Sequence, residues 1–145
     1  MNIKLRVHNL VHKCGTGDPF SIADTLGIRV MPLCLPMNIR GFFVRVMRRK
    51  YIVVNENLSE IAIAVVVCHE LGHIRLHLGY GYYFDFSGTY YVRSKREREA
   101  NEYAAHLLSH TYDVDSSLLA RIINEKQPEP KLVHQILSEF ATTGF

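Results

Sequence analysis

The first part of the chain contains two short helical patterns, each with its own end signals. Apolar residues recur at helical spacing near residues 2–14 and Gly15 follows as a helix-ending residue, which predicts a first helix. Asp18-Pro19 is typical of a helix start, with Asp as the N-cap and Pro at the first helical position. A short second helix should therefore run from this pair to Gly27. Its expected buried residues are Phe20, Ala23 and Leu26.

From Ile28 the pattern changes to short runs of β-branched and aromatic residues, which is typical of strands. The basic turn Met47–Lys50 separates two of these runs and predicts a hairpin. Pro32, Pro36 and Asn38 mark a loop before it. The expected strands are Ile28–Val30, Gly41–Met47 and Tyr51–Asn55. We therefore expect a small antiparallel sheet.

The second half of the chain is predicted to be mainly helical. Asn57 and Glu60 form a capping-box pattern that opens a long helix, which Gly79 should close. Apolar residues lie all the way round this helix from Leu58 through Val67, so it should be the central buried helix. The segments expected after it are a loop or irregular hairpin over residues 79–91, a helix from Ser94 to about Ser109, and two amphipathic segments near residues 116–126 and 131–140.

The order of helices, then a small antiparallel sheet, then helices predicts an α+β fold with the sheet packed on the central helix. The chain has 145 residues, which indicates a single domain over residues 1–145. We expect its core at about residues 10–110 and a helical extension over residues 111–145. Hydrophobic residues make up 48% of the chain and charged residues 21%, which excludes the disordered and fibrous classes.

Net charge, cysteine content and apolar runs limit the binding partners and the cellular compartment that we expect. A net charge of +3 is too small to indicate nucleic-acid binding by itself. The three cysteines are odd in number and far apart, which disfavours a disulfide framework and fits a reducing cytoplasm. The longest apolar run, Ile61–Cys68, is too short to span a bilayer, and Met1–Leu10 has no continuous apolar core of a signal peptide. We expect a cytoplasmic protein with no membrane partner.

The strongest chemical signal is HELGH at residues 69–73, which matches the pattern HExxH. Histidines four residues apart lie on one face of a helix, so both imidazoles can bind the same ion. Glu70 is rotated by about 100° from His69 and can reach a water on the ion rather than the ion itself. This is the arrangement that a zinc hydrolase needs. The competing interpretation is a chance match, which the buried helical setting disfavours.

A third protein ligand is needed, and the extended pattern HExxHxxGxxH fails because Leu76 and Gly79 occupy its last two defined positions. His77 lies about 12 Å along the helix axis from His69, which is too far to share the ion. We interpret His77 as a supporting or packing residue, with direct ligation as the less favoured option.

The other source of a ligand is the helix expected from Ser94. Glu97 and Asn101 lie at the edge of its buried face, whereas Glu99 points well away from it, as do Glu102 and His106. Glu97 is therefore the favoured third ligand, and Asn101 is placed to hold a ligand imidazole through its second ring nitrogen. The competing interpretation is that Ser94 and Glu97 form a capping box. The expected buried residues of this helix are Ala100, Tyr103, Ala104, Leu107 and Leu108.

Together these segments resemble the ImmA/IrrE family of metallopeptidases. HELGHIRLH at residues 69–77 and EREANEYAAHLL at residues 97–108 are similar to its two hallmark segments, and the resemblance covers roughly residues 10–110. It implies a compact zincin-like domain with a gluzincin-type site, in which His69, His73 and Glu97 hold Zn²⁺ and Glu70 is the general base.

The resemblance also implies a partner. The family's typical task is to cleave a helix-turn-helix repressor or a similar regulator in bacteria and their mobile elements. The chain departs from the family where Ser109-His110 follows the paired leucines in place of the usual Met-Pro. The short C-terminal part leaves no room for a separate DNA-binding domain, so we expect no direct nucleic-acid binding.

Two points stay open at this stage. The donor that stabilises the developing oxyanion is not decided among His77 and the tyrosines that crowd the next loop, and a strand edge beside the helix could take an extended peptide substrate. The tyrosines are Tyr80, Tyr82, Tyr83, Tyr90 and Tyr91.

Two other functions compete with proteolysis. A non-catalytic binding module or toxin–antitoxin partner could use the same fold, although the intact Glu70 weighs against it. Two basic clusters could contact phosphates, although solvated surface is the favoured interpretation. The clusters consist of Arg45, Arg48, Arg49 and Lys50, and of Arg93, Lys95, Arg96 and Arg98.

Overall fold

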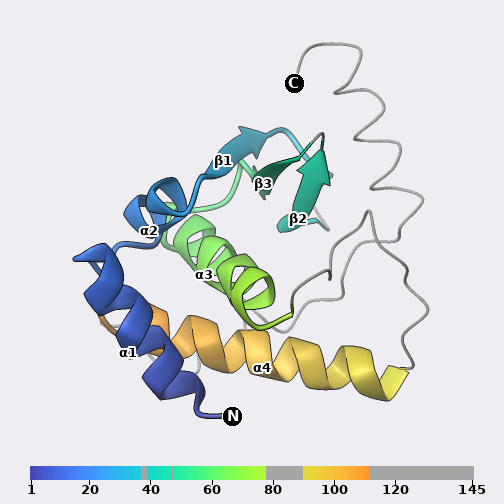
Figure 1. Ribbon diagram of the computed structural model, residues 1–145. Helices are drawn as coiled ribbons and strands as arrows, with labels where there is room; N and C mark the ends of the chain where they lie inside the picture. Colours follow the sequence, from blue (N-terminus) through green and yellow to red (C-terminus); the bar gives the residue numbers. More distant parts are fainter. Residues whose placement is uncertain (37–38, 47, 78–89, 112–145) are drawn as a thin grey trace.

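The computed structural model describes residues 1–36, 39–46, 48–77 and 90–111 (Figure 1). Within these residues a small sheet lies on one side of a central helix, and a second long helix lies on the other side (Figure 1). This is an α+β arrangement, as the sequence predicts. The elements are α1 (Ile3–Cys14), α2 (Pro19–Thr25), β1 (Ile28–Leu33), β2 (Gly41–Val46), β3 (Arg49–Asn55), α3 (Glu60–Leu76) and α4 (Tyr90–Leu108).

α1 begins and ends at the predicted signals, whereas α2 begins at its predicted start but ends at Thr25, before the predicted end at Gly27. The side chain of Asn2 caps α1, and Gly15 ends it in the left-handed conformation with φ of 70°. Asp18 caps α2, with Pro19 as the first helical residue. Of the predicted inner face of α2, Ala23 is buried and Phe20 and Leu26 pack partly buried against the core. Local sequence therefore determines this region.

The sheet is mixed rather than wholly antiparallel. β2 and β3 form the predicted hairpin, with Val46 opposite Arg49 and a tight turn in which Arg48 has φ of 70°. β1, however, pairs in parallel with β3, and the strand order is β1-β3-β2. The reason is that the connection between β1 and β2 leaves them apart in the sheet, so that β3 lies between them and pairs with both.

A buried asparagine fixes that connection. Asn55, at the end of β3, donates from its side-chain amide to the carbonyl oxygens of Leu35, Pro36 and Ile39 at 3.3, 3.3 and 3.0 Å. Pro32, expected in a loop, lies in β1 opposite Val54. β1 is an edge strand of the described sheet, so the missing N–H of a proline is tolerated there.

α3 is the central helix, between the sheet and α4 (Figure 1). Its N-cap is Ser59, whose hydroxyl accepts from the amide of Ala62 at 3.2 Å, so the predicted cap at Asn57 is two residues early. The helix ends at Leu76 with His77 as C-cap, whereas the predicted end, Gly79, lies outside the described residues.

α4 begins at Tyr90, four residues before the predicted start. Its far end is tied to the N-terminal helices, because the hydroxyl of Thr111 donates to the carbonyl oxygen of Gly17 at 2.8 Å. The expected loop over residues 79–91 falls mostly outside the described residues, and the two expected C-terminal helices, near residues 116–126 and 131–140, fall wholly outside them. In the described part of the chain, none of the helices is long and apolar enough to cross a membrane.

Candidate metal centre

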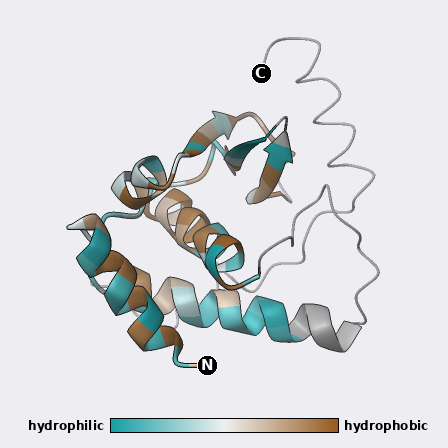
Figure 2. Cartoon of the chain, viewed as in Figure 1, coloured by the Kyte–Doolittle hydropathy of each residue, from teal (hydrophilic) through white to brown (hydrophobic). Residues whose placement is uncertain are grey.

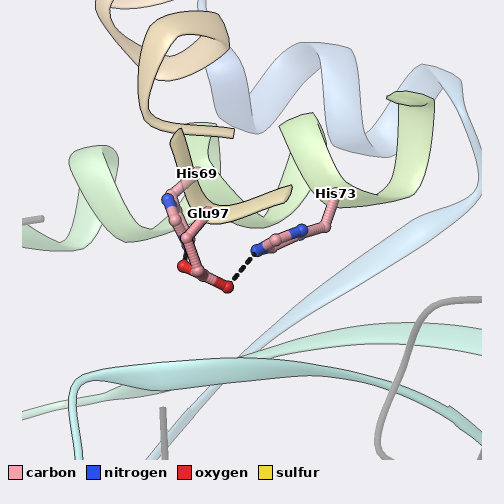
Figure 3. A group of neighbouring side chains, drawn as sticks. All are labelled: His69, His73 and Glu97. Atoms are coloured by element: carbon pink, nitrogen blue, oxygen red, sulfur yellow. Dashed lines mark ion pairs between the residues drawn. The ribbon is translucent and has the colours of Figure 1, made fainter. Parts of the chain in front are cut away.

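Two histidines of α3 and one glutamate of α4 converge beside the central helix (Figure 3). Nε2 of His69 lies 3.1 Å from Oε2 of Glu97, and Nε2 of His73 lies 2.9 Å from Oε1 of the same carboxylate. Their ligand atoms all lie within 4.8 Å of one another, and the imidazole rings stand at 89° to each other. Among the described residues this is the group that fits a metal ion.

The donor set and its spacing fit zinc. Zn–N and Zn–O bonds of about 2.0–2.2 Å in tetrahedral geometry place neighbouring ligand atoms about 3.3 Å apart. The distances of 2.9 and 3.1 Å from Glu97 to the two histidines are within a few tenths of that value. Two neutral nitrogens and one carboxylate leave a fourth position for water.

The start of α4 bears on the capping-box interpretation of Glu97. α4 is already helical from Tyr90, so Ser94 lies inside the helix and cannot cap it with Glu97. Glu97 instead directs its carboxylate to both histidines (Figure 3). Glu99 is not part of the group of three.

Glu97 reaches α3 because the two helices approach closely at Gly72, inside the HELGH segment. A Cβ atom at Gly72 would lie 3.1 Å from the Cα of Ala100, 3.1 Å from the Cβ of Tyr103 and 3.2 Å from the Ala100 carbonyl oxygen. The glycine between the two histidines therefore allows α4 to lie against α3.

The cluster shifts the acidity of its members. Burial alone would raise the pKa of Glu97, but hydrogen bonds from His69 and His73 outweigh it and hold the pKa well below its ordinary value. Burial alone would lower the pKa of His69, but the contact with Glu97 and the charge of Glu70 raise it. Glu97 is therefore an anion that two imidazoles share.

Glu70 lies on the same helix, 4% exposed, and faces the sheet. Burial raises its pKa above the ordinary value, against the charges of His69 and His73, which lower it. The backbone amide of Phe43 in β2 donates a hydrogen bond to its carboxylate. Because β2 is an edge strand of the described sheet, Glu70 lies beside a strand edge.

The second ring nitrogens of the two histidines face different partners. Nδ1 of His69 and Oδ1 of Asn101 are both buried, and the interaction of this asparagine with His69 contributes to the raised pKa of the histidine. Nδ1 of His73 lies 3.0 Å from Nδ1 of His77. Both residues expected to support the histidines therefore lie next to them.

His77 is not a member of the group of three that could hold a metal ion. Its ring instead lies between His73 and Glu99, with Nε2 3.8 Å from Oε2 of Glu99. Burial, followed by the positive charge of His73, lowers the pKa of His77 to about 4. Glu99 was expected to point well away from the buried face, yet its side chain is 16% exposed and directed at His77. The reason is the end of α3, where His77 leaves helical geometry with φ of −125°.

Comparison with known proteins identifies the family. The family model described as IrrE N-terminal-like domain, of the M78 peptidases, matches residues 23–121. This chain belongs to that family. An immunity region protein 2 of Bacillus phage phi105, described as uncharacterized, is 39% identical over 106 residues, which are 73% of this chain and 67% of the phage protein. No solved structure gives a significant match.

Within the IrrE-like domain, some site features lie beyond sequence reasoning. The contacts of Glu70 with Phe43 and of His77 with Glu99 join segments far apart in the chain, and periodicity carries no signal for either. Cys68, expected as a core thiol, is fully buried, and burial together with the charge of Asp18 raises its pKa. The candidate oxyanion tyrosines at positions 80, 82 and 83 lie outside the described residues, and the side chains of those at 90 and 91 are not described.

Proposed function

We propose that this protein is a zinc-dependent endopeptidase that cleaves a regulatory protein of the helix-turn-helix repressor class. The observation that carries the proposal is the convergence of His69, His73 and Glu97 on one point beside Glu70. Membership of a peptidase family and the phage immunity-region relative support the same assignment. The metal is proposed as zinc because the donor set is two imidazoles and one carboxylate.

Each residue has a separate task. His69 and His73 offer neutral Nε2 atoms, and Glu97 adds one negative charge, so the three would hold the ion and balance part of its charge. Zinc bound by these three residues would supply Lewis acidity, to polarise the scissile carbonyl and to lower the pKa of water toward about 7. Glu70 accepts the proton of the attacking water and returns it to the leaving amine.

The substrate approaches as an extended peptide along β2. Backbone groups on the free side of an edge strand bind such a peptide by strand addition, and the contact between the Phe43 amide and Glu70 lies at that edge. Strand addition recognises backbone, so a flexible segment of the regulator suits the site better than a folded helix.

The test of the catalytic assignment is Glu70→Gln. The variant keeps the shape of the side chain and all three proposed ligands, so it should bind zinc as the wild type does. Cleavage of the candidate repressor, followed on a gel, should fall by about 10²–10⁴-fold because the general base is lost. A small helix-turn-helix protein encoded next to this chain is the first substrate to try.

Two results would contradict the proposed function, and each would remove a different part of it. Glu70→Gln cleaving at the wild-type rate would remove the proposed base. Zinc-loaded wild-type protein that binds the repressor without cutting it would establish the competing function, a non-catalytic binding module. Glu102→Gln, on the outer face of α4, is the matched control and should cleave normally, because Glu102 is exposed and distant from the three ligands.

A further inference from the structure

The two proposed histidine ligands are supported in different ways. Asn101, from α4, interacts with His69, whereas Nδ1 of His73 lies 3.0 Å from the imidazole of His77 at the end of the same helix. An imidazole that receives a hydrogen bond through one nitrogen carries its proton on the other in the neutral state. The contact between His73 and His77 therefore constrains the protonation of both rings.

The geometry permits one arrangement of protons once an ion is bound. A metal held at Nε2 of His73 leaves the proton of that neutral ring on Nδ1. Nδ1 of His77, 3.0 Å away, must then accept this hydrogen bond, because two donors or two acceptors cannot pair. The proton of His77 is consequently on Nε2.

Nε2 of His77 is directed at a carboxylate. It lies 3.8 Å from Oε2 of Glu99, at ion-pair distance, and the side chains are only 8% and 16% exposed. A negative charge at this position favours the tautomer with the proton on Nε2, which is the one required above. Glu99, His77 and His73 thus form a continuous line that ends at the proposed ion.

We propose that His77 and Glu99 are positioning residues of a relay that fixes His73 as a ligand through Nε2: His77 is hydrogen-bonded to His73, and Glu99 acts on His77 by its charge at ion-pair distance. The relay rests on the proposed zinc site, whose ligand set and general base it leaves unchanged. Partners of this kind orient a ligating imidazole and increase its basicity, and their loss typically lowers metal affinity about 10–100-fold.

α4 offers a matched control for Glu99. Glu102 also lies 3.8 Å from a histidine, His106, but there the side chains are 57% and 33% exposed and neither belongs to the metal-binding group. The two pairs have the same separation and differ in burial and in connection to the site. An effect of charge removal at Glu99 alone would therefore come from the site.

The experiment measures zinc affinity by competition with a chromophoric chelator, using the full-length chain. His77→Ala should weaken binding by about 10–100-fold, because Nδ1 of His73 loses its acceptor. His77→Asn places an amide oxygen near the position of the lost Nδ1 and should recover most of the affinity. Glu99→Gln should weaken binding severalfold, while Glu102→Gln should leave it unchanged.

A spectroscopic measurement follows the relay directly. In the zinc-loaded wild type, ¹⁵N chemical shifts should show the proton of His73 on Nδ1 and that of His77 on Nε2. Cobalt-substituted His77→Ala should show an altered visible spectrum, which His77→Asn restores. Circular dichroism of each variant establishes that it is folded.

The outcomes separate the relay from the proposed function. Wild-type affinity in His77→Ala, or a His77→Asn variant no tighter than His77→Ala, would overturn the relay and leave the catalytic assignment standing. A zinc-loaded protein with the proton of His77 on Nδ1 would also overturn it. Undiminished cleavage by Glu70→Gln would instead remove the proposed base and leave the relay intact.

Discussion

α3 and α4 have similar lengths and lie against each other, yet they differ in their relation to water. Every residue of α3 from Ala64 to Ile74 is buried, whereas residues 95–108 of α4 include both buried and exposed positions. In Figure 2, α3 is largely hydrophobic and the coloured part of α4 is largely hydrophilic. The buried helix α3 carries two of the proposed ligands, both histidines, and the half-exposed helix α4 carries the third, the charged Glu97. Burying an isolated carboxylate is costly, so a helix that keeps one face in water is the cheaper source of the charge.

The largest expected effect distinguishes two neighbouring acids of α4, the proposed ligand Glu97 and the supporting residue Glu99. Glu97→Ala removes a proposed ligand and should lower zinc affinity at least about 100-fold, or about 2.7 kcal/mol. Glu99→Ala removes only a supporting charge and should lower it by about tenfold or less. Metal content after dialysis and chelator competition measure both. A greater loss in Glu99→Ala than in Glu97→Ala would reassign the third ligand.

The contact between the helices is tested by Gly72→Ala. Alanine favours helix over glycine by about 1 kcal/mol, so on propensity alone the variant would be more stable. The new methyl group meets the backbone of Ala100, however, and overpacking of this kind costs about 1–3 kcal/mol. We expect a net loss of stability in urea unfolding together with weaker zinc binding. A gain of about 1 kcal/mol would show that the helices do not approach so closely.

The free energy of unfolding should depend on pH in the alkaline range, because Tyr103 is buried on the inner face of α4. Burial raises the pKa of Tyr103 to about 12, which outweighs the opposing effect of Arg75. The folded pKa lies above the unfolded value of about 10, so this stabilisation is complete below pH 10 and is lost as the pH rises toward 12. The free energy of unfolding should fall by up to about 1.4 kcal/mol per pH unit in that interval.

Tyr103→Phe is the control for this pH dependence. The other groups that titrate above pH 10 are present in both proteins, so their contributions cancel when the two slopes are subtracted. The variant should show a shallower fall, by about one proton. Equal slopes in the two proteins would mean that Tyr103 ionises in the folded protein as easily as in the unfolded chain.

The smallest effect is expected on the outer face of α4. Glu102 lies 3.8 Å from His106 with both side chains largely in water, and exposed pairs of this kind contribute about 0–1 kcal/mol. Glu102→Ala should therefore change the free energy of unfolding by less than about 0.5 kcal/mol. A loss above 1 kcal/mol would mean that α4 is not half-exposed, and the contrast with α3 would disappear.

The sequence predicts the part of the site on α3 more directly than the part on α4. The HELGH segment specifies by itself how its two histidines lie relative to each other, because residues one turn apart on a helix are neighbours whatever surrounds them. The helical wheel places Glu97 at the edge of the inner face of α4, with a capping role as the alternative, and in the structure its carboxylate lies 3.1 Å from His69 and 2.9 Å from His73. That alternative depended on the start of α4, which local signals at Ser94 placed four residues late.

Features formed by packing were harder to predict. The parallel pairing of β1 with β3 depends on the position of β3 between β1 and β2 in the sheet, which the turn residues do not specify. Glu99 looked outward on an ideal helical wheel, but the wheel does not include the end of a neighbouring helix, where His77 lies. Helix identity therefore followed from sequence, whereas contacts between elements required the structure.

The three proposed ligands stand on both sides of the connection over residues 78–89, two on α3 and one on α4. An ion held there would join the two helices as a cross-link does and close a ring through that connection. Because the ion binds the folded arrangement, its binding energy adds to that of folding, by about 4 kcal/mol when free zinc exceeds the dissociation constant a thousandfold. The supply of zinc would then set the lifetime of the protein against degradation as well as its activity.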